Sequence, residues 1–120
     1  MPNVLESFGH ALDGIAHLLR TQPNFRVHLG IALVAVVLAA VLGFSGPELA
    51  VLVLTIVLVL AAEGLNTGIE IAVTLASPER RPEAKAAKDI AAGVVLLTAI
   101  ASVAIGAFLF LPHLQGLFGR

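Results

Sequence analysis

The sequence predicts an all-α membrane protein, with an N-terminal interfacial amphipathic helix followed by three transmembrane helices. Two observations lead to this fold class. Hydrophobic residues make up 58% of the 120 residues and charged residues only 12%, a balance that ordinary soluble domains do not have. The apolar residues also form three long stretches, separated by short segments that contain Gly, Pro or charged residues. We expect residues 1–120 to form one membrane domain that oligomerises.

The amphipathic helix is predicted over about residues 4–20. Its apolar residues fall on one broad helical face, whereas Glu6, Asp13 and His17 lie elsewhere. The helix is too polar to span a bilayer, so we expect it to lie in the plane of the lipid headgroups. Pro23 ends it, because proline disfavours a helical conformation in the residue before it. The apolar face consists of Val4, Leu5, Phe8, Leu12, Ile15, Leu18 and Leu19.

The three spans follow this helix. A turn over residues 43–47 ends the first span, and a hydrophilic loop over residues 77–83 ends the second. We expect Pro112 to close the third span, because proline interrupts a helix. The predicted spans are about residues 27–44, 49–74 and 86–111.

Basic residues near the predicted spans give the orientation. Arg20 and Arg26 precede the first span, four further basic residues surround the loop between the second and third spans, and the first connecting loop has none. Because short cytoplasmic loops carry an excess of Lys and Arg, the N-terminal helix and the second loop are expected on the cytoplasmic side. The same count argues against a nucleic-acid partner, since the few basic residues form no stripe.

A polar face interrupts the second span. Glu63, Asn66 and Glu70 are spaced i, i+3 and i+7, so they project from one side of a helix, with Thr67 beside them. A carboxylate in the membrane centre costs at least about 2.5 kcal/mol, so such groups usually mark a site. The structural alternative is a polar clamp between helices. The histidines have no spacing that would fix a metal, and we interpret His10, His17, His28 and His113 as interfacial residues.

These residue types suit phosphoryl transfer to a hydroxyl. Glu63, the deeper carboxylate, can act as a general base, and Glu70 lies about 10 Å nearer the cytosol, where it can bind Mg²⁺. Lys88 can neutralise phosphate charge, while Asn66 and Asp89 orient groups by hydrogen bonding. The sequence contains neither a P-loop nor a dinucleotide-binding fingerprint.

The runs Glu63–Glu70, Ala84–Asp89 and Ala91–Gly93 resemble the signature of the prokaryotic diacylglycerol kinase and undecaprenol kinase family. The resemblance extends from about Ser7 to Leu114, and the segments Asn24–His28 and Phe110–Pro112 look closer to the undecaprenol kinase branch. It implies a homotrimeric, multi-pass enzyme of the bacterial inner membrane, with a magnesium–ATP site at the cytoplasmic interface.

By motif position, Glu63 resembles the catalytic base of this family and Glu70 a magnesium ligand. Asn66 and Lys88 resemble polar groups of the active site. The nucleotide-side residues of the family are matched by Asp89 and Glu79.

Three positions depart from the family pattern. Gln22 stands where the family often has a second metal-binding glutamate, and a neutral amide binds Mg²⁺ more weakly. We keep Gln22 as a candidate for metal and nucleotide binding. Thr74 replaces an aspartate that is common after the motif, and Arg80 and Arg81 replace an aromatic residue and a histidine. The two arginines suit either lipid phosphates or a nucleotide.

The resemblance implies ATP-dependent phosphorylation of a lipid alcohol, either undecaprenol or diacylglycerol. Gln22 motivates an alternative, a catalytically weakened relative that acts as a structural or regulatory membrane subunit. A transport subunit would need discontinuous helices or repeats, and neither is evident. We further expect active sites shared between chains of the trimer, because the polar face of one chain must be covered by a neighbour. Gly64 and Gly68 form a GxxxG pair that would permit close packing.

Overall fold

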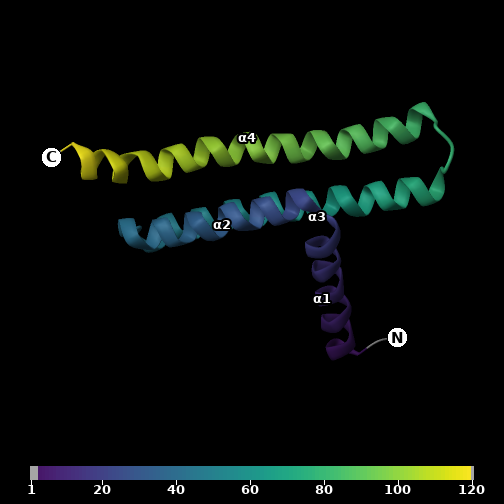
Figure 1. Ribbon diagram of the computed structural model, residues 1–120, viewed down its shortest axis with the longest axis horizontal. Coiled ribbons are helices and arrows are strands. Elements are labelled where there is room, and N and C mark those ends of the chain that lie inside the picture. Colours follow the sequence, from purple (N-terminus) through teal and green to yellow (C-terminus); the bar gives the residue numbers. More distant parts are fainter. Residues whose placement is uncertain (1–2, 120) are drawn as a thin grey trace.

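The computed structural model describes residues 3–119, which form four helices joined by short connections. Three of them, α2 to α4, lie alongside one another, and α1 projects from this bundle at a steep angle (Figure 1). The three bundle helices are long and apolar enough to cross a membrane. The helices are α1 (Val4–Thr21), α2 (Pro23–Leu42), α3 (Gly46–Ala76) and α4 (Pro82–Phe118).

A tight elbow joins α1 to α2. Gln22 is extended and is the only residue between the two helices, and Pro23 occupies the first turn of α2, where its missing N–H costs nothing. The Arg26 guanidinium donates to the carbonyl oxygens of Leu19 at 2.8 Å and Arg20 at 3.2 Å. Because these carbonyls lie at the open end of α1, Arg26 caps that helix and fixes the elbow. The predicted break at Pro23 is confirmed.

The turn between α2 and α3 is also confirmed. Gly43 ends α2 in the left-handed conformation with φ 77°, which favours glycine. Ser45 then caps α3, because its hydroxyl accepts from the Glu48 N–H while the Glu48 carboxylate accepts from the Ser45 N–H. Phe44, between these two caps, is buried with Ala39 and Leu52 in the core cluster at this end of the bundle.

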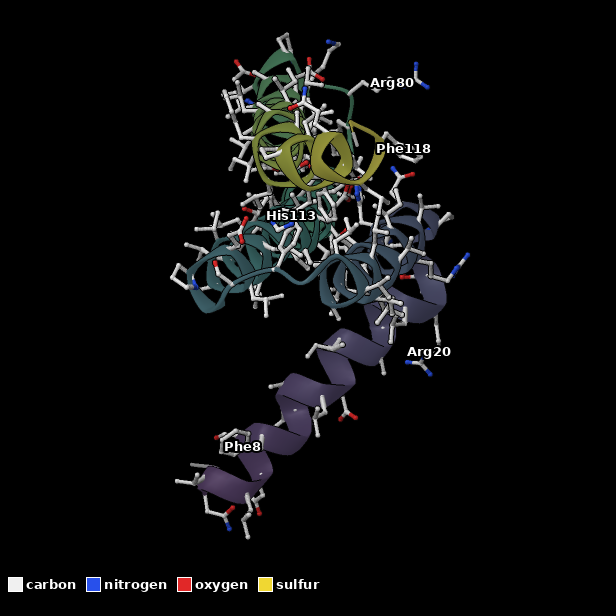
Figure 2. All side chains as sticks on the ribbon, turned by 90° about the vertical axis from the view of Figure 1, so that its left-hand side faces the viewer. Phe8, Arg20, Arg80, His113 and Phe118 are labelled. Carbon is white, nitrogen blue, oxygen red and sulfur yellow. The ribbon has the colours of Figure 1, made fainter. Side chains whose placement is uncertain are left out.

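Helices α3 and α4 run antiparallel and are the longest elements, with 31 and 37 residues. At 1.5 Å per residue, α4 is about 55 Å long, whereas the hydrocarbon core of a bilayer is about 30 Å thick. Both helices therefore extend beyond the hydrocarbon. Their connection, residues 77–81, carries Glu79, Arg80 and Arg81 at the end of the bundle, and Figure 2 shows Arg80 pointing away from the helices.

Helix α4 does not end at Pro112, where we expected the third span to close, but continues to Phe118. Proline removes one main-chain hydrogen bond, but the turns on either side keep theirs. A neighbouring contact also supports this turn, since the next residue, His113, reaches Glu48 of α3. Membrane helices tolerate proline when neighbouring groups stabilise the local backbone in this way.

Gly64 allows two helices of the same chain to pack closely. A Cβ atom built on Gly64 would lie 3.3 Å from Leu18 Cδ1 of α1, whereas one on Gly68 would meet nothing within 4 Å. The small residue therefore serves the docking of α1 on α3. Helix α1 has no buried residue, so its apolar face is exposed in a single chain.

Candidate active site

The residues of the polar face predicted on α3 differ in how far they are buried. Glu63 and Thr67 are buried, Asn66 is half-buried and Glu70 is exposed. The Thr67 hydroxyl donates to the main-chain oxygen of Glu63 at 3.1 Å, which leaves the Glu63 carboxylate free of that hydroxyl. The spacing argument is thus confirmed, and α3 carries one carboxylate inside the bundle and another at its surface.

Glu63 lies against a histidine of α2. Its Oε1 atom is 3.3 Å from His28 Nε2, and the side chains are 9% and 28% exposed, respectively. His28, which we interpreted as an interfacial residue, thus also contacts the polar face of α3. A usable signal was present, because a histidine inside a predicted span is costly for the same reason as a carboxylate.

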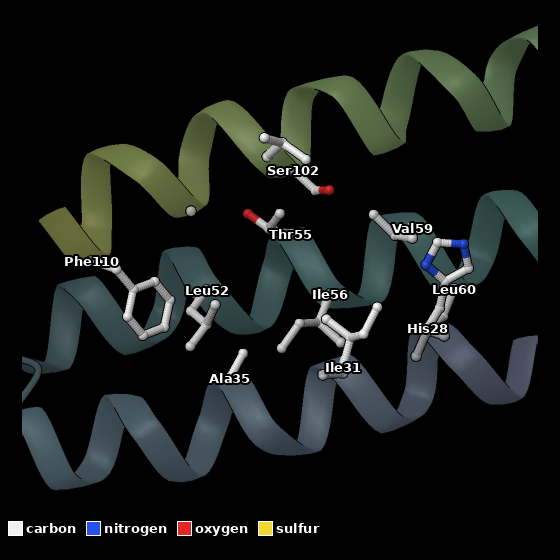
Figure 3. Close-up of a pocket in the computed structure, with 13 residues that line it drawn as sticks. His28, Ile31, Ala35, Leu52, Thr55, Ile56, Val59, Leu60, Ser102 and Phe110 are labelled. Carbon is white, nitrogen blue, oxygen red and sulfur yellow. The ribbon is translucent and has the colours of Figure 1, made fainter.

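An apolar groove of about 270 Å³ begins at His28 and runs between α2, α3 and α4. Figure 3 shows His28 at one end and the Phe110 ring at the other, with Thr55 and Ser102 facing each other between them. Both hydroxyls donate to main-chain oxygens of their own helices at 2.7 Å, so they add little polarity to the groove. The groove suits an apolar chain.

Gln22 and Glu70 are brought together by the elbow. They line one pocket of about 350 Å³, with Thr67 and Thr74 on its wall. All four side chains offer oxygen atoms, the donors that Mg²⁺ prefers. Over residues 3–119 there is no group of three or more His, Cys, Asp or Glu side chains that could hold a metal. This pocket thus fits Mg²⁺ only in its usual form, with few protein ligands completed by water and substrate phosphates.

A second polar pocket, of about 560 Å³, lies where α3, the connecting loop and α4 meet. Glu79, Lys88 and Asp89 line it, as do Arg80 and Arg81, and we call it the cationic pocket. Lys88 is half-buried, and Asp89 makes its ion pair with Lys85, at 2.6 Å, in the i, i+4 register. Thr74 lines both this pocket and the Gln22–Glu70 pocket, so the two are neighbours.

The structure therefore assembles the predicted residues in three groups. Glu63 is paired with His28, Gln22 lies with Glu70, and Glu79 lies with Lys88 and Asp89. Across the part of the chain that the structure describes, no ion pair joins Lys88 or Asp89 to Glu63 or Glu70. A single chain thus presents a buried carboxylate, an oxygen-lined pocket and a cationic pocket.

Comparison with known proteins identifies the family of this chain. The family model described as prokaryotic diacylglycerol kinase matches residues 9–110. A diacylglycerol kinase of Synechocystis sp. is 44% identical over 97% of this chain and 67% of its own length. The undecaprenol kinase of Bacillus subtilis is 39% identical over 91% of this chain and 89% of its own, and a Pseudomonas aeruginosa diacylglycerol kinase is 34% identical over 83% of each. The chain belongs to the prokaryotic diacylglycerol kinase family, whose members named here are lipid kinases.

Proposed function

We propose that this protein transfers the γ-phosphoryl group of ATP to the hydroxyl of a membrane lipid at the cytoplasmic face of the bacterial inner membrane. The observation that carries the proposal is the position of Glu63, a buried carboxylate beside the His28 end of an apolar groove. A lipid tail in the groove would bring its hydroxyl to this carboxylate. The relatives are named for two lipid alcohols, diacylglycerol and undecaprenol, and both are candidates.

In this proposal Glu63 accepts the proton of the lipid hydroxyl. The hydroxyl oxygen forms a bond to the γ-phosphorus, and the bond between that phosphorus and the ADP oxygen breaks. Asn66, half-buried one turn from Glu63, orients the reacting groups. Lys88 neutralises phosphate charge, and Asp89 and Glu79 contact the nucleotide from the cationic pocket.

Glu70 and Gln22 are the residues that would hold Mg²⁺. When bound, Mg²⁺ neutralises the charge that develops on the phosphate oxygens. Thr74 lines both polar pockets, so its hydroxyl is available to groups bound in either one.

The test is a phosphotransfer assay on the purified protein with γ-labelled ATP, Mg²⁺ and either diacylglycerol or undecaprenol in mixed micelles. We expect label in the lipid fraction with at least one lipid, and its loss in Glu63→Gln. Glu6→Gln is the matched control, because Glu6 lies in the first turn of α1 and its carboxylate accepts from the Asn3 N–H, away from the polar face of α3. Absence of transfer to both lipids by the wild-type protein would refute the proposal.

The homotrimer with shared sites belongs to the same proposal. In one chain no ion pair joins Glu63 to the two polar pockets, and α1 exposes its apolar face, so we infer that a neighbouring copy closes the site. Mixing Glu63→Gln chains with Lys88→Met chains tests this. We expect recovered activity in mixed oligomers, verified by co-purification of two tags. Well-mixed oligomers that recover no activity would mean that each chain builds its site alone.

A structural or regulatory subunit is the second candidate, favoured by Gln22 in the metal pocket. It predicts that the wild-type protein binds lipid but transfers no phosphate, and that Gln22→Glu restores transfer. Activity of the wild-type protein at millimolar Mg²⁺ would exclude it.

A further inference from the structure

The Glu63–His28 pair raises the question of how the proton leaves the site. The Glu63 carboxylate is 9% exposed, and over residues 3–119 His28 is the only ionisable side chain that pairs with it. A general base that keeps its proton cannot act in the next turnover. The groove walls near His28 are the apolar side chains of Ile31, Val59 and Leu60, which offer the proton no acceptor (Figure 3). The proton therefore needs another route out.

The His28 imidazole meets the requirements of that route. Its Nε2 atom faces Glu63 Oε1 at 3.3 Å, and its side chain is three times as exposed as that of Glu63, 28% against 9%. A neutral imidazole with its hydrogen on Nδ1 accepts a proton at Nε2 and can release the other from Nδ1. Proton transfer from the acid form of Glu63 to His28 thus restores the carboxylate without any further reactant.

No other titratable group competes for this position. Helix α4 has none between Asp89 and His113, and α3 has none between Glu48 and Glu63. From α1, His17 approaches α3 but lines the space beside Gly64 and Thr67 rather than the groove. His28 is thus the group in contact with Glu63 on the α2 side.

We propose that His28 is a positioning residue that orients Glu63 and takes up its proton after each phosphoryl transfer. This inference rests on the function proposed above. The lipid hydroxyl gives its proton to Glu63, that proton passes to His28 Nε2, and the Nδ1 proton passes to water at the exposed side of the ring. Exchange of the ring protons with water then returns the hydrogen from Nε2 to Nδ1, which restores the starting tautomer. The phosphorylated lipid and ADP are unchanged by this step, so atoms and charge balance over the cycle.

The experiment uses the full-length protein in lipid with the lipid substrate that supports wild-type activity. His28→Ala should lower kcat by about 100-fold, the lower range for loss of general acid–base participation. Added imidazole should restore activity in proportion to the concentration of its neutral form, with little change in the KM for the lipid. His17→Ala is the matched control and should keep wild-type activity, and Glu63→Gln should not respond to imidazole.

Several results would overturn the inference while leaving the kinase function intact. A His28→Ala protein with more than half of the wild-type kcat would show that His28 is dispensable. A folded, oligomeric His28→Ala protein that is inactive and unresponsive to imidazole would show that the ring acts only by packing. If His28→Ala does not fold, His28→Gln decides, because wild-type turnover with an amide at this position excludes a proton acceptor. An inactive wild-type protein would instead refute the proposed function.

Discussion

Glu63 and Glu48 each lie against a histidine of another helix, Glu63 at 3.3 Å from His28 and Glu48 at 2.8 Å from His113. Their surroundings differ. Both carboxylate oxygens of Glu48 are occupied, one by the Ser45 N–H and the other by the His113 ring. Within residues 3–119 the Glu63 carboxylate accepts no hydrogen bond and has only the His28 contact.

The aromatic neighbours sharpen the difference. The His113 ring stacks on Phe44, with centroids 4.7 Å apart, and Phe44 in turn contacts Phe110 at 4.8 Å. Figure 2 shows His113 between α4 and the helices beneath it. The Glu48 pair is therefore a structural clasp that joins the turn before α3 to the end of α4. A carboxylate with all its partners in place stabilises a fold, whereas one with spare capacity is available for chemistry.

The largest expected effect is the difference in phosphotransfer activity between variants of the two glutamates. Glu63→Gln should reduce phosphotransfer by about 100-fold or more, because an amide cannot accept the hydroxyl proton. Glu48→Gln keeps the shape of the clasp and should change turnover less than about twofold, since Glu48 lies at the opposite end of the groove. Initial rates at saturating ATP measure both. Equal losses in the two variants would show that the comparison is wrong.

The second prediction concerns the metal side of the site. Gln22→Glu places a carboxylate in the pocket of Glu70, so half-maximal activity should need several-fold less Mg²⁺ than in the wild type. A magnesium titration at fixed ATP measures the change, with Gln115→Glu near the end of α4 as the control. An unchanged or higher requirement would place Gln22 outside the metal shell.

The third prediction concerns the clasp. Ser45→Ala removes the α3 cap and should lower the free energy of unfolding by about 1 kcal/mol without a change in KM. Ser7→Ala, on the exposed side of α1, is the control for loss of a hydroxyl. Unfolding in mixed micelles, followed by circular dichroism, measures the difference. A kinetic defect without a change in stability would give the clasp a catalytic role.

The smallest effect concerns the glycines beside Glu63. Gly68→Ala meets no neighbouring atom and should stabilise α3 by up to about 1 kcal/mol, because alanine is the better helix former. Gly64→Ala should gain less, because its Cβ would press on Leu18. The same unfolding measurement compares the two. Equal stabilisation would mean that α1 does not dock on α3 through Gly64.

Local features of the fold were predictable from the sequence. The break at Pro23 and the turn at residues 43–47 follow from residues that act on their own backbone, and both are confirmed. The continuation of α4 through Pro112 and the contact between His113 and Glu48 were not predictable in this way. These two residues are 65 positions apart. Helix periodicity gives the faces of each helix but not the register between helices.

In the candidate site, too, features of one helix were predictable and contacts between helices were not. The face of Glu63, Asn66 and Glu70 came from spacing on one helix, and the structure confirms their common side. The partners of these residues came only from tertiary structure, since His28 reaches Glu63 from α2 and Gln22 reaches the Glu70 pocket from the elbow. The roles of Lys88, Asp89 and Glu79 as nucleotide-side residues stay predictions, although the structure gathers all three around one pocket.

The Arg26 cap at the elbow has a consequence for how deeply the enzyme sits in the membrane. Two hydrogen bonds from one guanidinium fix the end of α1 to the start of α2, and Leu18 of α1 rests on α3 at Gly64. In the proposed placement, α1 floats at the level of the headgroups while α3 crosses the hydrocarbon. The elbow then fixes the depth of Glu63 relative to α1. Because Glu63 is next to Gly64, which Leu18 contacts, this placement puts Glu63 near the level of α1, where it would meet lipids whose hydroxyl lies close to the headgroups.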